Sequence, residues 1–263
     1  MNIKLKDLIP ENISPEEIEN YFIHHNMNEI VEKSKAESRG INEMQVENLY
    51  KPELDDLYRL HKLVVDLKRT TVLEFGCGWS SLVLSHALDI NRKLYSKEIK
   101  NLRRNNPFEH HSIDNIKKFS DVSINRIIEF GLDNSSHSVS GVMAYDFQGK
   151  LTTRYEKLPK VNPDFIYLDA PDQFNVMGDI NGLNTDHKDF MPMSSDLILI
   201  EHFLTPGTII LVDGRTANSR FLKANFQRNW DYHHDRDNDQ HYFLLNETSL
   251  GIINQNQLDF YSF

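Results

Sequence analysis

Apolar residues recur along this chain at two different spacings, and the change between them falls near residue 70. In "YKPELDDLYRLHKLVVDL", leucine and valine return every three or four positions, which predicts a helix with one apolar face. Earlier in the chain, "ISPEEI" carries a helix-start signal, because Ser14 can cap the helix, Pro15 suits its first turn and Glu17 completes a capping box. We therefore expect a helical N-terminal extension over residues 1–68.

From residue 69 onward, short apolar runs alternate with helical patterns. The predicted strands are "TTVLEF" (70–75), "RKLYSKEI" (92–99), "INRIIEF" (124–130), "PDFIYLDAP" (163–171) and "GTIILVDGR" (207–215). The predicted helices are "SSLVLSHAL", "SSDLILIEHFL" and "NSRFLKANFQRNW", and "HYFLLNETSLGIINQ" has the pattern of two final strands joined by a turn. This alternation favours a mostly parallel sheet covered by helices on both faces, with an antiparallel strand at the edge. We expect one α/β domain over residues 69–263.

The composition narrows the class of protein. A net charge of −10, from 39 acidic and 29 basic residues, disfavours nucleic acid as a partner, because such binding rests on neutralising phosphates. The single cysteine, Cys77, permits no intrachain disulfide. The sequence has neither a signal-peptide core nor a run approaching the ~18 apolar residues of a membrane span. These features predict a cytoplasmic protein with no membrane partner, and they are compatible with a homodimer.

The stretch "VLEFGCGWSS" places special residues between the first predicted strand and its helix. Gly76 and Gly78 remove side chains where the backbone turns tightly or meets a ligand, and Ser80 and Ser81 can cap the helix or bind that ligand. A dinucleotide site would require a third glycine, and the carboxylate of Glu74 would repel its pyrophosphate. The same carboxylate suits a cationic ligand such as S-adenosylmethionine, which has a sulfonium and an ammonium but no phosphate.

This stretch resembles the first motif of class I S-adenosylmethionine-dependent methyltransferases, hydrophobic-hydrophobic-E/D-x-G-x-G-x-G/S, with Ser80 at the last position. The resemblance implies a Rossmann-like three-layer sandwich with a seven-stranded, mostly parallel sheet. It also implies S-adenosylmethionine as cofactor, with Glu98 holding the ribose hydroxyls at the end of the second strand. The cofactor-binding residues expected on this basis are Glu74, Gly76, Cys77, Gly78, Trp79, Ser80, Ser81, Glu98, Tyr145 and Asp169. Among these, Tyr145 is the candidate for the contact with the adenine ring. It fits equally well in an inserted hairpin, "GVMAYDFQGKLTTRYEKL".

Methyl transfer to an oxygen needs a group that removes the proton of the acceptor. Asp169 and Asp213 follow the fourth and fifth predicted strands, and His187 lies in a polar loop, so these three are the catalytic candidates. Each of them also has a non-catalytic interpretation: Asp169 can cap the following loop, Asp213 can be a turn residue, and His187 can be a solvent-exposed histidine. Catechol-type O-methyltransferases hold Mg²⁺ at two such aspartates and an adjacent asparagine, but Gly214 stands at that place, so we expect no metal ion.

The segment 171–193 is long enough to be functional, and we expect it to form part of the acceptor pocket or a lid. Asp172 and Gln173 in this segment, together with Arg215, are the candidate substrate-binding residues. The histidine doublets at 24–25, 110–111 and 233–234 lack the spacing of a metal site and are interpreted as surface residues.

The sequence thus predicts an S-adenosylmethionine-dependent methyltransferase acting on oxygen or nitrogen of a small-molecule or sugar-type acceptor. "DAPD" stands where amino-methylating enzymes of bases or glutamine have an "NPPY"-like motif. Two alternatives stay open at this point. One is a nicotinamide-dependent oxidoreductase, and the other is a non-catalytic protein that keeps the fold as a binding module.

Overall fold

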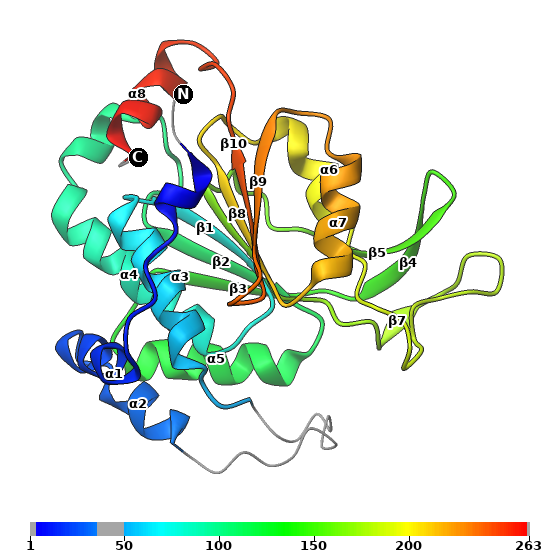
Figure 1. Ribbon diagram of the computed structural model, residues 1–263, viewed down its shortest axis with the longest axis horizontal. Coiled ribbons are helices and arrows are strands. Elements are labelled where there is room, and N and C mark those ends of the chain that lie inside the picture. Colours follow the sequence, from blue (N-terminus) through cyan, green and yellow to red (C-terminus); the bar gives the residue numbers. More distant parts are fainter. Residues whose placement is uncertain (1–3, 36–49, 262–263) are drawn as a thin grey trace.

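A computed structural model of the protein describes residues 4–35 and 50–261. Within these residues the main sheet contains seven strands in the order β3-β2-β1-β6-β8-β10-β9 (Figure 1). The strands are β1 (Thr71–Phe75), β2 (Glu109–Asp114), β3 (Ser135–Val139), β6 (Phe165–Leu168), β8 (Ile209–Asp213), β9 (Trp230–Asp235) and β10 (Gln240–Leu245). β10 runs antiparallel to both neighbours, and the pairs from β3 to β8 are all parallel. The mostly parallel sheet expected from the sequence is confirmed, with its antiparallel strand one place in from the edge.

Helices cover both faces of this sheet. They are α1 (Pro15–His24), α2 (Asn28–Ser34), α3 (Leu54–Asp66), α4 (Trp79–Tyr95), α5 (Lys117–Glu129), α6 (Asp196–Ile200), α7 (Thr216–Asn225) and α8 (Ile252–Phe260), with short 3₁₀ turns η1 (Leu5–Leu8), η2 (Glu98–Asn101) and η3 (Glu201–Phe203). In Figure 1, α3, α4 and α5 lie on one side of the sheet and α6 and α7 on the other. The arrangement is the three-layer sandwich that the sequence predicts.

The core lies between the sheet and these two helical layers, and β1 contributes to both. Val72 packs with Leu60 of α3 and Leu84 of α4, whereas Leu73, the next residue along the strand, packs with Leu197 of α6. Successive side chains of a strand point to opposite faces, so an apolar run such as "VLEF" can fill both layers. Burial of each aliphatic side chain contributes about 1.5–3 kcal/mol to stability.

The N-terminal helices form as their sequence indicates. The Glu17 amide donates to Ser14 Oγ over 3.3 Å and the Ser14 amide donates to Glu17 Oε2 over 2.9 Å, so the expected capping box is present at the start of α1. α3 shares a core with α4 and β1. A separate unit ending at residue 68 therefore stays a prediction, and residues 36–49 of that extension lie outside the described residues.

Two of the predicted strands are wrong, and both are helical. Residues 92–95 are the last turn of α4 and are followed by η2, and residues 124–129 belong to α5. The true second and third strands are β2 and β3, with the polar sequences "EHHSID" and "SSHSV". Apolar periodicity could not find them, because polar side chains such as His110 and Ser112 are buried there through hydrogen bonds.

The C-terminal prediction is half right. "HYFLL" belongs to β10, but residues 252–260 form α8 instead of a last strand. The partner of β10 at the edge is β9, whose first residue, Trp230, was assigned to the preceding helix. The six residues of β9 are all half-buried, so the strand is too short and too uniform for periodicity to separate it from a helix.

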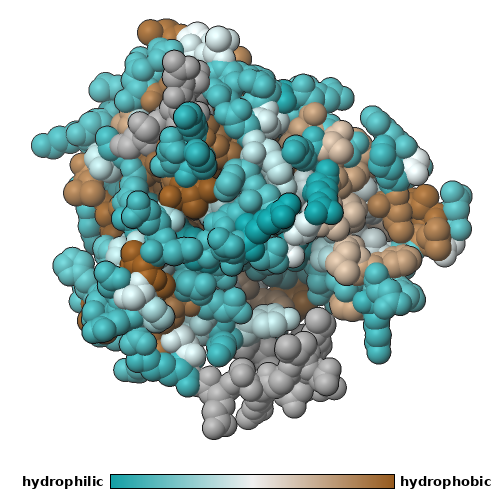
Figure 2. Space-filling view, in the orientation of Figure 1, coloured by the Kyte–Doolittle hydropathy of each residue, from teal (hydrophilic) through white to brown (hydrophobic). Residues whose placement is uncertain are grey.

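A small second sheet projects beside the main one, in the order β5-β4-β7 (Figure 1). Its strands are β4 (Val142–Phe147), β5 (Lys150–Tyr155) and β7 (Val176–Met177), so the inserted hairpin is confirmed. Its turn residues Gln148 and Gly149 both have positive φ, as a two-residue type I′ turn requires. This sheet and the loop after it carry several exposed apolar or aromatic side chains: Met143, Tyr145, Met177, Leu183, Phe190 and Met191. Figure 2 shows a hydrophobic area at the right, the side on which Figure 1 places this sheet.

None of the helices in the described part of the chain is both long and apolar enough to cross a lipid bilayer.

Candidate functional site

The turn between β1 and α4 lies at the carboxyl edge of the parallel strands, where open α/β sheets bind their ligands. Gly76 has a φ of +112°, and a Cβ atom there would lie 3.3 Å from the Cβ of Ala170. The fold itself therefore requires Gly76. A Cβ atom on Gly78, by contrast, would have only Ser80 Oγ within 4 Å, at 3.6 Å. The protein leaves space above Gly78, where a ligand can approach the backbone.

Glu74 lies beneath this turn, with 1% of its surface exposed. Its carboxylate accepts hydrogen bonds of 2.5 Å from both Ser80 Oγ and Ser81 Oγ, and it is 2.9 Å from His110 Nε2. The three partners come from the start of α4 and from β2. Glu74 thus ties the turn to the sheet, and its side chain is not directed into the open space as the sequence interpretation assumed. The doublet histidine His110, expected at the surface, is fully buried by this contact.

Asp114 ends β2 at the level of the glycine turn. The turn and the strand are joined there, since the Gly76 amide donates to the Ile113 carbonyl over 2.8 Å. The Asp114 carboxylate accepts the Ile116 amide over 2.7 Å and is 4% exposed. Burial raises the pKa of Asp114 to about 7, and the negative charge of Glu74 contributes to the rise. Hydrogen bonds from the backbone amides of Ile116, Cys77 and Asn115 act in the opposite direction.

Glu98, the carboxylate expected to hold a ribose at this place, lies elsewhere. It is exposed in η2, just after the C-terminus of α4. α4 starts at the glycine turn and has 17 residues, so it spans about 25 Å and carries Glu98 toward the opposite edge of the sheet. Asp114 occupies the position that the sequence analysis gave to Glu98. The missed signal is an acidic residue that ends a polar strand.

Asp169 and Asp213 are brought together at the ends of β6 and β8. Leu168 pairs with Val212 in the parallel ladder, so the two aspartates follow in adjacent positions. The Tyr167 hydroxyl donates to Asp213 Oδ2 over 2.8 Å. Burial raises the pKa of Asp213 to about 7, and the neighbouring Asp169 and Asp56 contribute to the rise.

Asp169 lies at the same edge of the sheet, directly after β6. The loss of hydration raises its pKa to about 6, and Arg215, whose Nε is 3.8 Å from Asp169 Oδ1, opposes this rise. However, 56% of the Asp169 side chain is accessible to solvent. Water therefore screens this carboxylate more than it screens Asp213, and we expect the smaller shift at Asp169.

Helix α3 adds a carboxylate that the sequence analysis did not identify. Asp56 accepts hydrogen bonds from the Arg59 guanidinium and, over 3.0 Å, from Gln240 Nε2. Gln240 is in register with Asp213, so α3 reaches the end of β8. Burial raises the pKa of Asp56 to about 6 despite Arg59. In the sequence, Asp56 looks like any acidic residue in the first turn of a helix, where a negative charge is favourable. Nothing in the local sequence marks it as part of a site.

Two cavities border the main sheet on opposite edges. One of about 320 Å³ lies between the N-terminal extension, the start of α3 and the turn before β10, and Arg59 is part of its wall. The other, of about 780 Å³, lies at the amino edge beside Thr71 and Phe203. Neither of these two cavities is lined by the glycine turn; the smaller one is connected to the carboxyl edge through Arg59, which donates to Asp56.

Of the candidate substrate-binding residues, Arg215 and Asp172 lie at the carboxyl edge of the sheet. The Arg215 guanidinium donates to the carbonyls of Asp169 and Pro171, so it fastens the loop after β6. Asp172 is half-buried beside it; burial raises the pKa of Asp172 and Arg215 lowers it. Gln173 is half-buried, and its backbone carbonyl accepts a hydrogen bond from the Thr185 hydroxyl over 2.9 Å. This bond joins two distant parts of the segment 171–193.

Other predicted residues are directed elsewhere. The His187 ring, 56% exposed, accepts the Asp189 amide over 3.1 Å and packs on Phe190. In the hairpin, Tyr145 lies under the Arg154 guanidinium, with 3.7 Å from its carbon to the ring centroid. These contacts place His187 and Tyr145 on the small sheet and its loop instead of at the glycine turn.

The two remaining residues of the turn serve packing. Cys77 Sγ is 3.2 Å from Ser112 Oγ, and burial raises the pKa of the thiol, which disfavours the thiolate form that reacts as a nucleophile. Trp79 is buried in the helical layer, where the Arg126 guanidinium carbon lies 3.4 Å from the Trp79 ring centroid.

No protein-family model matches this chain, and no curated protein matches it by sequence. Among solved structures it is similar to the S-adenosylhomocysteine-bound methyltransferase PaMTH1 of Podospora anserina, with a TM-score of 0.50, 13% identity and coverage of 90% of this chain and 99% of that one. The O-methyltransferase TomG of Streptomyces achromogenes, in complex with S-adenosylmethionine, matches with a TM-score of 0.39 and 12% identity over 92% of this chain and 93% of TomG. The likeness to PaMTH1 confirms the Rossmann-like methyltransferase fold that the glycine-turn motif implied.

Proposed function

We propose that the protein is an S-adenosylmethionine-dependent methyltransferase. The observation that carries the proposal is the excess of carboxylates at the carboxyl edge. Glu74, Asp114, Asp169, Asp213 and Asp56 gather there. They outnumber the guanidinium groups of the arginines that pair with them. Such an edge attracts a sulfonium and an ammonium and repels a pyrophosphate, which favours this cofactor over a nicotinamide dinucleotide.

In this proposal, the cofactor extends from the glycine turn toward the end of β3. Gly78 leaves room for the methionine part, and the Asp114 carboxylate accepts the two ribose hydroxyls, as a carboxylate can for a vicinal diol. The Ser140 amide donates to the Asp114 carbonyl over 3.0 Å, so the segment at Ser140 and Gly141 adjoins the ribose site and is the candidate for the adenine contact.

The transfer itself is an in-line displacement, in which the acceptor atom bonds to the methyl carbon as the carbon–sulfur bond breaks. The protein has to align the acceptor, exclude water and, for an oxygen acceptor, receive its proton. We assign the role of general base to Asp213. Its pKa of about 7 is close to neutral pH, and a general base is most effective when its pKa is near the working pH. Asp169 is the second candidate, since it is more exposed to solvent.

Methyl transfer by these residues proceeds without a metal ion in our proposal. Gly214 follows Asp213 and offers no side-chain oxygen to complete a Mg²⁺ site with the two aspartates. Added Mg²⁺ should therefore change neither the affinity for the cofactor nor the rate of transfer.

The acceptor is a small molecule with an apolar part. Met177 lies against Gly141, because a Cβ atom on that glycine would come within 2.6 Å of the methionine methyl carbon. The exposed apolar side chains of the small sheet thus begin next to the proposed adenine segment and can form one wall of an acceptor pocket.

Isothermal titration calorimetry of the full chain tests the proposal. S-adenosylhomocysteine should bind with a one-to-one stoichiometry and raise the melting temperature, whereas NADH should produce neither effect. A saturable heat with NADH and none with S-adenosylhomocysteine would refute the methyltransferase and favour the oxidoreductase. Binding without product in an acceptor screen, read as S-adenosylhomocysteine released from S-adenosylmethionine, would leave a non-catalytic binding protein.

A further inference from the structure

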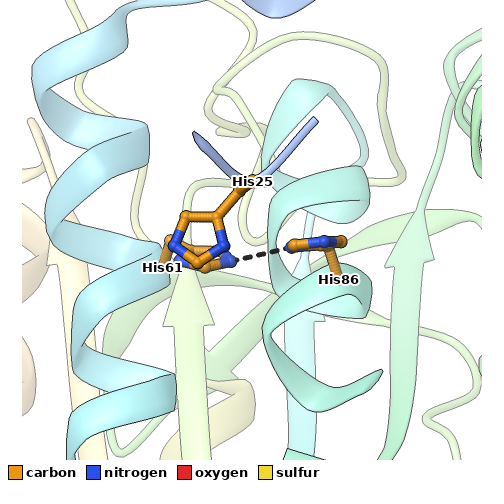
Figure 3. A group of neighbouring side chains, drawn as sticks. All are labelled: His25, His61 and His86. Carbon is orange, nitrogen blue, oxygen red and sulfur yellow. Dashed lines mark hydrogen bonds between the residues drawn. The ribbon is translucent and has the colours of Figure 1, made fainter. Parts of the chain in front are cut away.

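Three histidines from three helices converge away from the glycine turn (Figure 3). His25 is the C-cap residue that follows α1, His61 belongs to α3 and His86 belongs to α4. One ring nitrogen of each lies within 4.8 Å of the others, and His61 Nε2 is 3.0 Å from His86 Nδ1. Figure 3 shows the His25 ring over that of His61, with His86 facing both. From the sequence His25 was expected at the surface, but the tertiary structure turns its ring inward.

The spacing of these nitrogens is close to that of a tetrahedral metal site. With metal–nitrogen bonds of about 2.0–2.1 Å, two imidazole nitrogens on one Zn²⁺ are about 3.3 Å apart. The pair His61–His86 is already near this separation, and the His25 ring must shift by about an ångström to join it. Such a shift is within reach of a half-buried side chain at a helix end.

A tyrosine orients the central histidine. The Tyr21 hydroxyl lies 2.5 Å from His61 Nδ1. If that nitrogen carries the proton and donates it to the tyrosine oxygen, Nε2 keeps a free lone pair and points at the other two rings. Metal-bound histidines commonly donate their second ring nitrogen in this way, which fixes the tautomer and the ring.

The surroundings keep the three rings neutral, which is the form that binds metals. His61 is fully buried, and burial places its pKa well below the usual 6.5. Burial likewise lowers the pKa of His86 to about 4 and that of His25, whose neighbours His24 and Lys62 add to the effect. Without a metal ion, the His61–His86 contact is a hydrogen bond, in which one of the two facing nitrogens carries the proton. A metal ion would replace that proton.

We propose that His25, His61 and His86 form a structural site for a divalent transition metal of the Zn²⁺ class, with a water molecule as the fourth ligand. Three imidazoles suit Zn²⁺, Co²⁺ and Ni²⁺ and not the oxygen-seeking Mg²⁺ or Ca²⁺. The ion would fasten α1 and α3 of the N-terminal extension to α4 of the main domain. This site is independent of the proposed methyl transfer.

A second group, His234, Asp239 and His241, is less suited. Both ring nitrogens of His241 are engaged by hydroxyl groups from outside the group, Nδ1 by Tyr232 at 2.9 Å and Nε2 by Thr216 at 3.0 Å. In the first group, by contrast, the Nε2 atom of His61 contacts another proposed ligand, His86. The residues of the second group therefore serve as a control for adventitious binding.

The test is a Co²⁺ and Zn²⁺ titration of the metal-free, tag-free full chain. We expect one equivalent of Co²⁺ to give the intense visible absorption of a tetrahedral site, and Zn²⁺ to displace it and raise the melting temperature. His25→Gln should weaken binding at least tenfold and remove the Co²⁺ bands. The matched control His24→Gln, which changes the exposed neighbour, should leave both unchanged.

His86→Gln should reproduce the loss, and His234→Gln should not. If His86→Gln fails to fold, His25→Gln still decides the matter, because the His25 side chain is only half-buried and follows the end of a helix. Absent Co²⁺ bands, an affinity unaltered by His25→Gln, or a loss caused by His234→Gln would each overturn the proposal.

Discussion

The two halves of the carboxyl edge are built differently. On the β1–β2 side, the Glu74 carboxylate has hydroxyl and imidazole partners on its two oxygens. On the β6–β8 side, Asp213 has Tyr167 and nearby carboxylates, and burial and repulsion raise its pKa to about 7. In the first half, satisfied hydrogen bonds around Glu74 hold the glycine turn to the sheet, and the one carboxyl group with a pKa near 7 is Asp114 at the end of β2. In the second half, the raised pKa of Asp213 comes from burial and from neighbouring carboxylates.

This difference matches the two tasks of the proposed enzyme. A cofactor that is the same in every turnover benefits from a preorganised turn, because little ordering remains to be done on binding. A general base must instead exchange a proton during each cycle, which requires a pKa near the working pH. Four substitutions test whether the two halves differ in this way, and Glu74→Ala should have the largest effect and Glu98→Gln the smallest.

The largest effect is expected for Glu74→Ala. The substitution leaves the Ser80, Ser81 and His110 groups without their acceptor, so we expect the free energy of unfolding to fall by about 3–5 kcal/mol. Urea denaturation followed by circular dichroism measures this loss. Asp213→Ala, which removes the acceptor of the Tyr167 hydroxyl, is the control and should cost less. Equal losses in the two variants would mean that the halves do not differ in rigidity.

Asp114→Asn is expected to weaken S-adenosylhomocysteine binding by about 10- to 100-fold, because an amide accepts the ribose hydroxyls less strongly than a carboxylate does. The fold should persist, since the introduced amide keeps an oxygen that can accept the Ile116 amide. Calorimetry on the variant and the wild type gives the ratio. A retained affinity would remove Asp114 from the ribose site.

Asp213→Asn should change how stability depends on pH. The folded pKa of Asp213, about 7, is above that of an unfolded aspartate, so the native protein binds more protons between about pH 4 and 7. Wild-type stability therefore falls as the pH rises through this range, and the penalty is complete above pH 7. The asparagine removes it, and we expect a gain on the order of 1–2 kcal/mol at pH 8 and none at pH 4.

Melting temperatures between pH 4 and 8 test this third prediction. Asp237→Asn, at an exposed position in the turn before β10, is the matched control and should leave the profile unaltered. If Asp213→Asn destabilises the protein at pH 8, the carboxylate contributes favourable contacts and does not carry the expected penalty.

Glu98→Gln should have the smallest effect, a change of less than about twofold in S-adenosylhomocysteine affinity, with stability altered by less than about 0.5 kcal/mol. The residue is exposed in η2 at the far end of α4. Calorimetry under the conditions used for Asp114→Asn makes the comparison direct. A tenfold loss here would restore the sequence-based assignment of the ribose carboxylate.

The sequence could predict the parts of the fold that depend on local signals. The capping box at Ser14, the apolar strands β1, β6 and β8, and the hairpin turn at Gln148 and Gly149 each require particular residues at particular spacings. The glycine turn belongs with them, because a φ of +112° at Gly76 excludes most other residues. The fold class followed from these elements and from the motif that they contain.

The sequence by itself therefore determined the mostly parallel sheet, the turn at Gly76 and the aspartates that end β6 and β8. Only the tertiary structure decided that β2 and β3 are polar strands, that Asp114 and not Glu98 ends the second strand, and that His25 faces His61 and His86. The physical reason is that periodicity reports burial of apolar side chains. A polar side chain becomes buried only when its hydrogen-bonding partner arrives from elsewhere in the chain, and that partner is not visible from the local sequence.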